Sequence, residues 1–84
     1  MEGAELRALI LRKLEDGTLP CDRPREIFAR SGRGDRCDAC GESIHPLQVE
    51  YEFDSPGHRH TVRLHLECAG LWEAFRLRRG GPCD

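Results

Sequence analysis

The chain has 84 residues, of which 38% are hydrophobic, and a formal net charge of −2. This length fits one domain, and the core of a domain this small is marginally stable on hydrophobic burial alone, so chains of this size often need an additional crosslink or metal. The slight negative charge excludes the strongly basic footprint of a dedicated nucleic-acid-binding domain.

Cysteine is frequent, with five residues in this short chain, and an odd number argues against a closed disulfide framework. We find no apolar run typical of a signal peptide or a membrane span. We therefore expect no membrane association and a reducing, cytoplasmic compartment, where paired cysteines indicate metal binding. Cys21 and Cys83 have no ligand-like neighbour in the sequence, so both are predicted to be free thiols.

Residues 4–15 are expected to form an amphipathic helix. Its apolar stripe consists of Leu6, Leu9, Ile10 and Leu14. Leu11 lies off this stripe. Because so short a helix is marginal alone in water, the stripe must pack against the metal-binding half of the chain.

Residues 17–36 are expected to form a connector, because prolines and glycines interrupt them. Ile27 and Phe28 form its large apolar pair and are predicted to anchor it to the core. The connector also contains five arginines: Arg23, Arg25, Arg30, Arg33 and Arg36. Nearby carboxylates favour a solvated loop of mixed charge. The alternative is a basic strip that meets an acidic partner or a phosphate.

Two matched pairs of metal-ligand residues follow. Cys37 and Cys40 are separated by two residues, and after 24 further residues His65 and Cys68 repeat that spacing. Three sulfurs and one nitrogen are a ligand set typical of tetrahedral zinc. The sequence therefore predicts one structural Zn²⁺ per chain, held by these four residues.

Two neighbouring residues, Gly41 and His45, help to decide which side chains are the zinc ligands. Gly41 suits the tight turn after the first cysteine pair, because glycine tolerates positive φ. His45 is the closest competitor for a ligand position, but the spacing of His65 to Cys68 suits one helix turn better. Four protein ligands close the coordination sphere, so we expect no catalytic position on the metal.

The segment between the two ligand pairs is expected to form a β-hairpin. Val49, Tyr51 and Phe53 alternate with polar residues, which predicts a half-buried strand that displays Glu50 and Glu52 on its outer face. Residues 54–57 have turn chemistry, and residues 60–64 alternate as the return strand.

A helix is expected from about residue 65 to residue 79. Cys68, Leu71, Trp72 and Phe75 fall on one face, so this face carries both a metal ligand and apolar anchors. Residues 37–79 thus combine a cysteine turn, a hairpin and a helix in one metal-binding unit within a single domain, residues 1–84.

This order of elements resembles a treble-clef zinc finger, and the ligand order is similar to the first zinc site of LIM domains. The chain also resembles a family of small bacterial zinc-binding proteins that has no established activity. The matching residues are Lys13-Leu14, Gly17-Thr18-Leu19-Pro20, Cys37-Asp38-Ala39-Cys40-Gly41-Glu42-Ser43-Ile44, Val49-Glu50-Tyr51-Glu52, and Leu64-His65-Leu66-Glu67-Cys68 with Trp72. The resemblance implies a small α+β zinc finger with an added N-terminal helix, and a fold of this kind does not define function.

Two function classes follow. We expect a non-catalytic zinc-binding module, a small protein-interaction or regulatory protein that contacts its protein partner through the connector and the N-terminal helix. The alternative is a nucleic-acid-binding zinc finger that uses the connector arginines together with Arg76, Arg78 and Arg79.

An enzyme is the weakest class. A treble-clef nuclease would need a catalytic histidine, such as His58 or His60, and a second metal site. The sequence shows neither a second ligand quartet nor a glycine-rich phosphate-binding loop.

Overall fold

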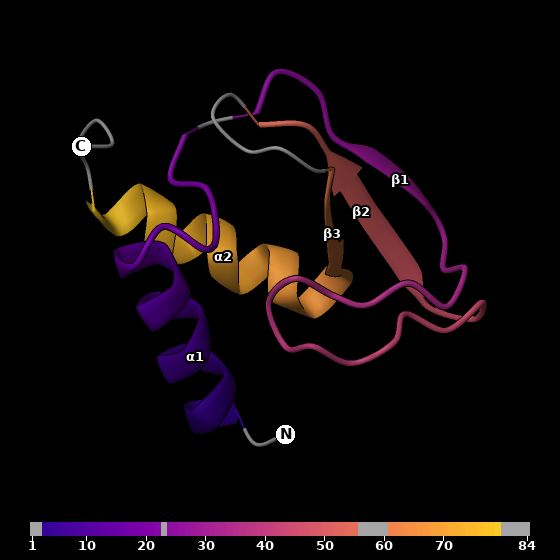
Figure 1. Ribbon diagram of the computed structural model, residues 1–84, viewed down its shortest axis with the longest axis horizontal. Helices are drawn as coiled ribbons and strands as arrows, with labels where there is room; N and C mark the ends of the chain where they lie inside the picture. The colour runs from indigo at the N-terminus through magenta and orange to yellow at the C-terminus, as the bar shows by residue number, and fades with distance from the viewer. Residues whose placement is uncertain (1–2, 23, 56–60, 80–84) are drawn as a thin grey trace.

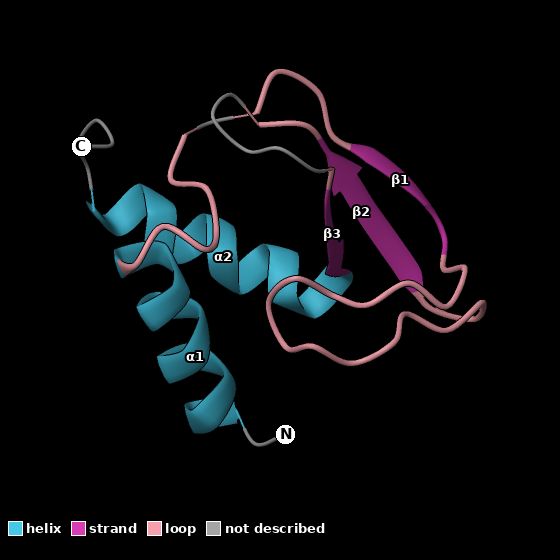
Figure 2. Cartoon of the chain, viewed as in Figure 1, coloured by secondary structure: helices cyan, strands magenta, loops and turns pink. Residues whose placement is uncertain are grey.

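The computed structural model describes residues 3–22, 24–55 and 61–79, except the side chain of Arg79. Within them the chain forms an α+β structure with a three-stranded antiparallel sheet of order β1-β2-β3 (Figures 1 and 2). The elements are α1 (Gly3–Glu15), β1 (Phe28–Ser31), β2 (Val49–Phe53), β3 (Val62–His65) and α2 (Leu66–Arg79). None of the described helices has the length and apolarity needed to cross a membrane.

Helix α1 packs against α2, which lies between α1 and the sheet (Figure 1). Leu6, Ile10 and Leu14 are buried, as the spacing predicted. Leu9 is half-buried at the margin of the stripe. Leu11 is 40% exposed, which agrees with its place off the stripe.

The core lies between α2 and the inner face of the sheet. Phe53, Val62 and Leu64 are buried there, and the ring of Phe53 stacks on that of Trp72 with 4.9 Å between centroids. The indole Nε1 of Trp72 donates a hydrogen bond to the carbonyl oxygen of Pro20 at 2.7 Å. Trp72 thus joins the sheet to the segment that follows α1, which supports its expected role as a core anchor.

The connector contains a strand that the sequence pattern did not predict. Residues 28–31 pair with β2 in the register Phe28↔Glu52 to Ser31↔Val49. All four residues of β1 are exposed, so the strand has no apolar alternation to reveal it. The anchoring role expected for Ile27 and Phe28 is wrong, because their exposed fractions are 41% and 59%. Backbone hydrogen bonds between β1 and β2 fix this part of the connector to the sheet instead.

The outer face of β2 also differs from expectation. Glu50 was expected to be exposed but is fully buried. Its Oε2 lies 3.4 Å from Arg30 Nε and 3.9 Å from Arg33 Nη2. Glu52 also forms ion pairs with both arginines and lies 3.5 Å from Arg63 Nε. The arginines fold over the polar face of the sheet and cover the carboxylate.

Cys21 also differs from expectation. Cys21 is disulfide-bonded, so the predicted free thiol at this position is wrong. Cys83, Arg23, His58 and His60 lie outside the described residues.

Candidate metal centre

The first ligand pair lies on a tight loop that its own backbone closes. Gly41 adopts φ +81°, and its N–H donates to the carbonyl oxygen of Cys37 at 2.9 Å. The N–H of Cys37 in turn donates to the carbonyl oxygen of Glu42 at 2.9 Å. The N–H of Ala39 points at the Cys37 sulfur, with 3.4 Å between nitrogen and Sγ. The positive φ needed after Cys40 explains why a glycine occupies position 41.

The second pair lies where the sheet meets α2. His65 is the last residue of β3, and Cys68 is in the first turn of α2. We expected the helix to begin near His65, but it begins one residue later, at Leu66. The end of the strand therefore positions the imidazole. The side chains of His65 and Cys68 still point toward the same place, as they would if both lay on the first turn of the helix.

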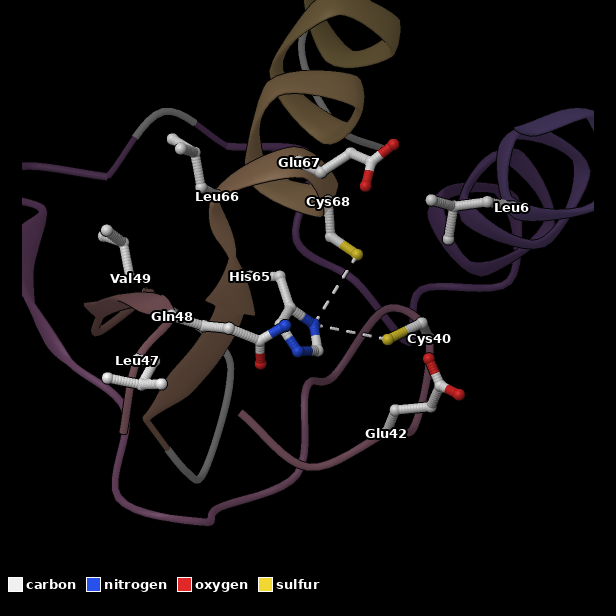
Figure 3. A pocket seen from close by; sticks show the side chains of 10 residues that line it. All are labelled: Leu6, Cys40, Glu42, Leu47, Gln48, Val49, His65, Leu66, Glu67 and Cys68. Carbon is white, nitrogen blue, oxygen red and sulfur yellow. Dashed lines mark hydrogen bonds between the residues drawn. The ribbon is translucent and has the colours of Figure 1, made fainter. Parts of the chain in front are cut away.

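The four predicted ligand atoms converge. The sulfurs of Cys37, Cys40 and Cys68 and a ring nitrogen of His65 all lie within 4.8 Å of one another. His65 Nδ1 is 3.4 Å from Cys40 Sγ and 4.0 Å from Cys68 Sγ (Figure 3). Ligand atoms around a tetrahedral zinc with Zn–S bonds of ~2.3 Å are about 3.8 Å apart. The cluster thus has the dimensions needed to hold a metal ion.

The imidazole of His65 is oriented by its second nitrogen. Nε2 lies 3.1 Å from the carbonyl oxygen of Ser43, which can only accept a hydrogen bond. A proton on Nε2 leaves the Nδ1 lone pair directed at the sulfurs. This is the supporting contact that metal-bound histidines usually have.

Asp38 fastens the cysteine loop to the sheet. Its N–H donates to the carbonyl oxygen of Arg63 at 2.8 Å, and its carboxylate Oδ2 accepts from the N–H of Arg63 at 2.8 Å. Because Arg63 is two residues before His65, these bonds fix the distance between the two ligand pairs.

Lys13 fastens the same loop to α1. Its Nζ donates to the carbonyl oxygens of Asp38 at 3.0 Å and of Ala39 at 2.8 Å. Sequence reasoning missed both Lys13 and Asp38 as supporting residues. Lys13 could have been singled out from the sequence, because it is the single lysine in the chain and lies in the last turn of the predicted helix.

The thiols interact strongly in the absence of a metal. A hydrogen bond from the Cys68 thiol, opposed by burial and assisted by backbone N–H groups, lowers the pKa of Cys37 to about 4. Donating that bond, together with burial, raises the pKa of Cys68. Burial raises the pKa of Cys40. The cluster therefore favours one thiolate, whereas a metal ion would favour three.

The competing histidine is not part of this cluster. His45 is exposed, and its backbone N–H donates to Gln48 Oε1 at 2.8 Å. In the described parts of the chain, the quartet is the one group of histidine, cysteine or acidic residues with metal-binding geometry.

We found no match for the chain among protein-family models, curated proteins or solved structures.

Proposed function

We propose that the protein is a non-catalytic module with one structural Zn²⁺ held by Cys37, Cys40, His65 and Cys68. The observation that carries this proposal is the convergence of the four ligand atoms to within 4.8 Å. Three thiolates, which are soft ligands, and one imidazole all suit zinc, and together they complete a tetrahedral coordination sphere. The cysteine loop, the hairpin of β2 and β3, and α2 then correspond to the parts of a treble-clef zinc finger.

A structural role for the metal is supported by where the ligands lie. The loop is joined to β3 by Asp38 and to α1 by Lys13, and the second ligand pair spans β3 and α2. An ion at this point would crosslink the cysteine loop, β3 and α2. The core of this domain is small, so such a crosslink would contribute strongly to its stability. Metal binding and folding are then coupled, as in other small zinc domains.

The metal's role is tested by thermal unfolding with and without a strong chelator. We expect chelation to abolish the cooperative transition, and added Zn²⁺ to restore it. Cys68→Ser should behave like the chelated protein, whereas Ser43→Ala, beside the cluster but contributing only its backbone, should unfold like the wild type. An unchanged transition after verified zinc removal would contradict a structural role.

We infer that the module acts by binding a protein. The alternative, nucleic-acid binding through the connector arginines, is weakened because Arg30 and Arg33 are paired with Glu50 and Glu52. Arg36 donates from Nη1 to the carbonyl oxygen of Gly41 at 2.9 Å. Charges neutralised in this way contribute little to the counterion release that drives nucleic-acid binding.

Gel shifts at low salt with duplex and single-stranded DNA and RNA test this alternative. We expect no sub-micromolar binding. Tight binding that weakens steeply with salt, and that Arg25→Ala or Arg78→Ala reduces, would move the protein to the nucleic-acid-binding class. Hydrolase and nuclease assays with zinc, magnesium or manganese should likewise show background rates, because the four ligands close the coordination sphere.

A further inference from the structure

A groove of about 620 Å³ opens beside the metal-ligand cluster. Its floor contains Cys40, His65 and Cys68, and its two ends differ in character (Figure 3). One end is apolar and the other is acidic. A volume of this size accommodates a few side chains rather than the face of a whole domain.

The apolar end is formed by Leu47, Val49 and Leu66 (Figure 3). Their exposed fractions are 99%, 40% and 54%. Leu47 is in the loop before β2, and Leu66 begins α2, so the three come from separate elements. Exposed aliphatic side chains that gather at one place, rather than being scattered singly, indicate an interaction site.

The acidic end carries Glu42 and Glu67, both exposed (Figure 3). Neither forms an ion pair with any residue that the structure describes, although Glu50 and Glu52 on the sheet are both paired with arginines. Among the residues that the structure describes, no lysine or arginine lines the groove. Three thiolates and one Zn²⁺ on its floor would add one net negative charge. The groove therefore offers unneutralised negative charge beside apolar surface.

We propose that this groove binds a segment of a partner protein that carries an aliphatic or aromatic side chain and, a few residues away, a lysine or arginine. The apolar side chain would lie against Leu47, Val49 and Leu66, and the basic group would approach Glu42 and Glu67. Charge complementarity selects this occupant over an acidic peptide or a phosphate. This inference rests on the proposed protein-binding role, and it places the contact on the groove instead of the connector.

The probe is a set of short synthetic peptides in a glycine-serine background, measured by fluorescence anisotropy with the zinc-loaded full chain. The peptides carry leucine plus arginine at varied spacing, leucine alone, arginine alone, or leucine plus glutamate. We expect the best leucine-arginine spacing to bind about tenfold more tightly than leucine alone, and leucine-glutamate to bind most weakly. Equal affinity across the set would overturn the proposal.

Substitutions then assign each end. Leu47→Ser should weaken the leucine-arginine peptide about tenfold, because it removes exposed apolar contact area without touching the core. Glu42→Gln combined with Glu67→Gln should abolish the preference for arginine and its salt dependence. The matched controls are Leu77→Ser on α2 and Glu15→Gln on α1, both exposed and remote from the groove lining. If the controls reduce binding as much as the groove variants do, the proposed site is wrong.

Zinc content and sedimentation on the same samples separate the remaining outcomes. A chain that holds one zinc but prefers no peptide overturns the groove proposal and leaves the zinc proposal standing. A folded chain without zinc overturns the proposed function itself. A concentration-dependent dimer that Leu47→Ser dissociates would assign the groove to a second copy of the chain and overturn the peptide proposal.

Discussion

Lys13 Nζ lies 2.8 Å from the carbonyl oxygen of Ala39, in the middle of the cysteine loop. It also contacts the preceding carbonyl, of Asp38, at 3.0 Å. The ammonium group holds two successive carbonyls of the cysteine loop through charge-assisted hydrogen bonds. The N-terminal helix and the cysteine loop are therefore coupled through one side chain.

Lys13→Met tests this coupling. The variant keeps the aliphatic stem but loses two charge-assisted hydrogen bonds, so we expect a free energy of unfolding lower by about 2 kcal/mol. Zinc affinity, measured by competition with a chelator, should fall about tenfold. Arg12→Met, one residue earlier and exposed, is the matched control. Equal behaviour of the two variants would show that the contact does not support the metal site.

The buried carboxylate gives a second test. Glu50 is fully buried, and both of its carboxylate oxygens lack a hydrogen bond in the structure. Arg30→Met should therefore destabilise the protein by about 3 kcal/mol, because it leaves a buried charge without its nearest partner. Adding Glu50→Met should recover most of that loss, since an apolar pair has no charge to desolvate. Urea unfolding of the two single variants and the double variant measures this, and strictly additive effects would contradict it.

Sequence patterns predicted the cluster of four candidate ligands because the spacing within each ligand pair is a local property. The two pairs repeat one spacing, and the loop and the strand–helix junction each present their pair to a common point. The stripe of α1 was predictable for the same reason, because Leu6, Ile10 and Leu14 recur at the helical period.

The outer face of the sheet was not predictable in this way. Alternation along β2 predicts that Glu50 and Phe53 lie on opposite faces of the sheet. It does not predict whether long side chains from another segment cover the polar face. The arginines that cover Glu50 reach it through β1, whose pairing depends on backbone hydrogen bonds rather than on an apolar pattern. The disulfide of Cys21 likewise depends on tertiary proximity.

The histidine assignment gives a third prediction. His65→Ala should lower zinc affinity at least a hundredfold, because it removes one ligand, whereas His65→Cys should retain one metal in an all-sulfur site. His45→Ala is the matched control, since this side chain is exposed outside the cluster. Absorption spectra of the cobalt-substituted proteins report the number of thiolate ligands. Loss of binding in His45→Ala with normal binding in His65→Ala would reverse the assignment.

The pH dependence of zinc binding follows from the thiol pKa values. Cys37 is a thiolate at neutral pH because its pKa is lowered to about 4, whereas Cys40 and Cys68 have raised pKa values and keep their protons. Zinc must displace those protons, so affinity should rise with pH from weakly acidic to alkaline conditions. Calorimetry in buffers of different ionisation enthalpy measures the proton release. Release of no protons at neutral pH would contradict this account of the cluster.

The most direct test of the central claim is the metal content of the purified full chain, measured by elemental analysis beside Cys40→Ser and a Ser43→Ala control, which alters a side chain outside the ligand set. The account predicts one zinc per chain in the wild type and the control, and loss of zinc together with loss of cooperative unfolding in Cys40→Ser. A wild-type protein that is folded and free of metal after expression with ample zinc, or that holds two zinc ions per chain, would contradict it.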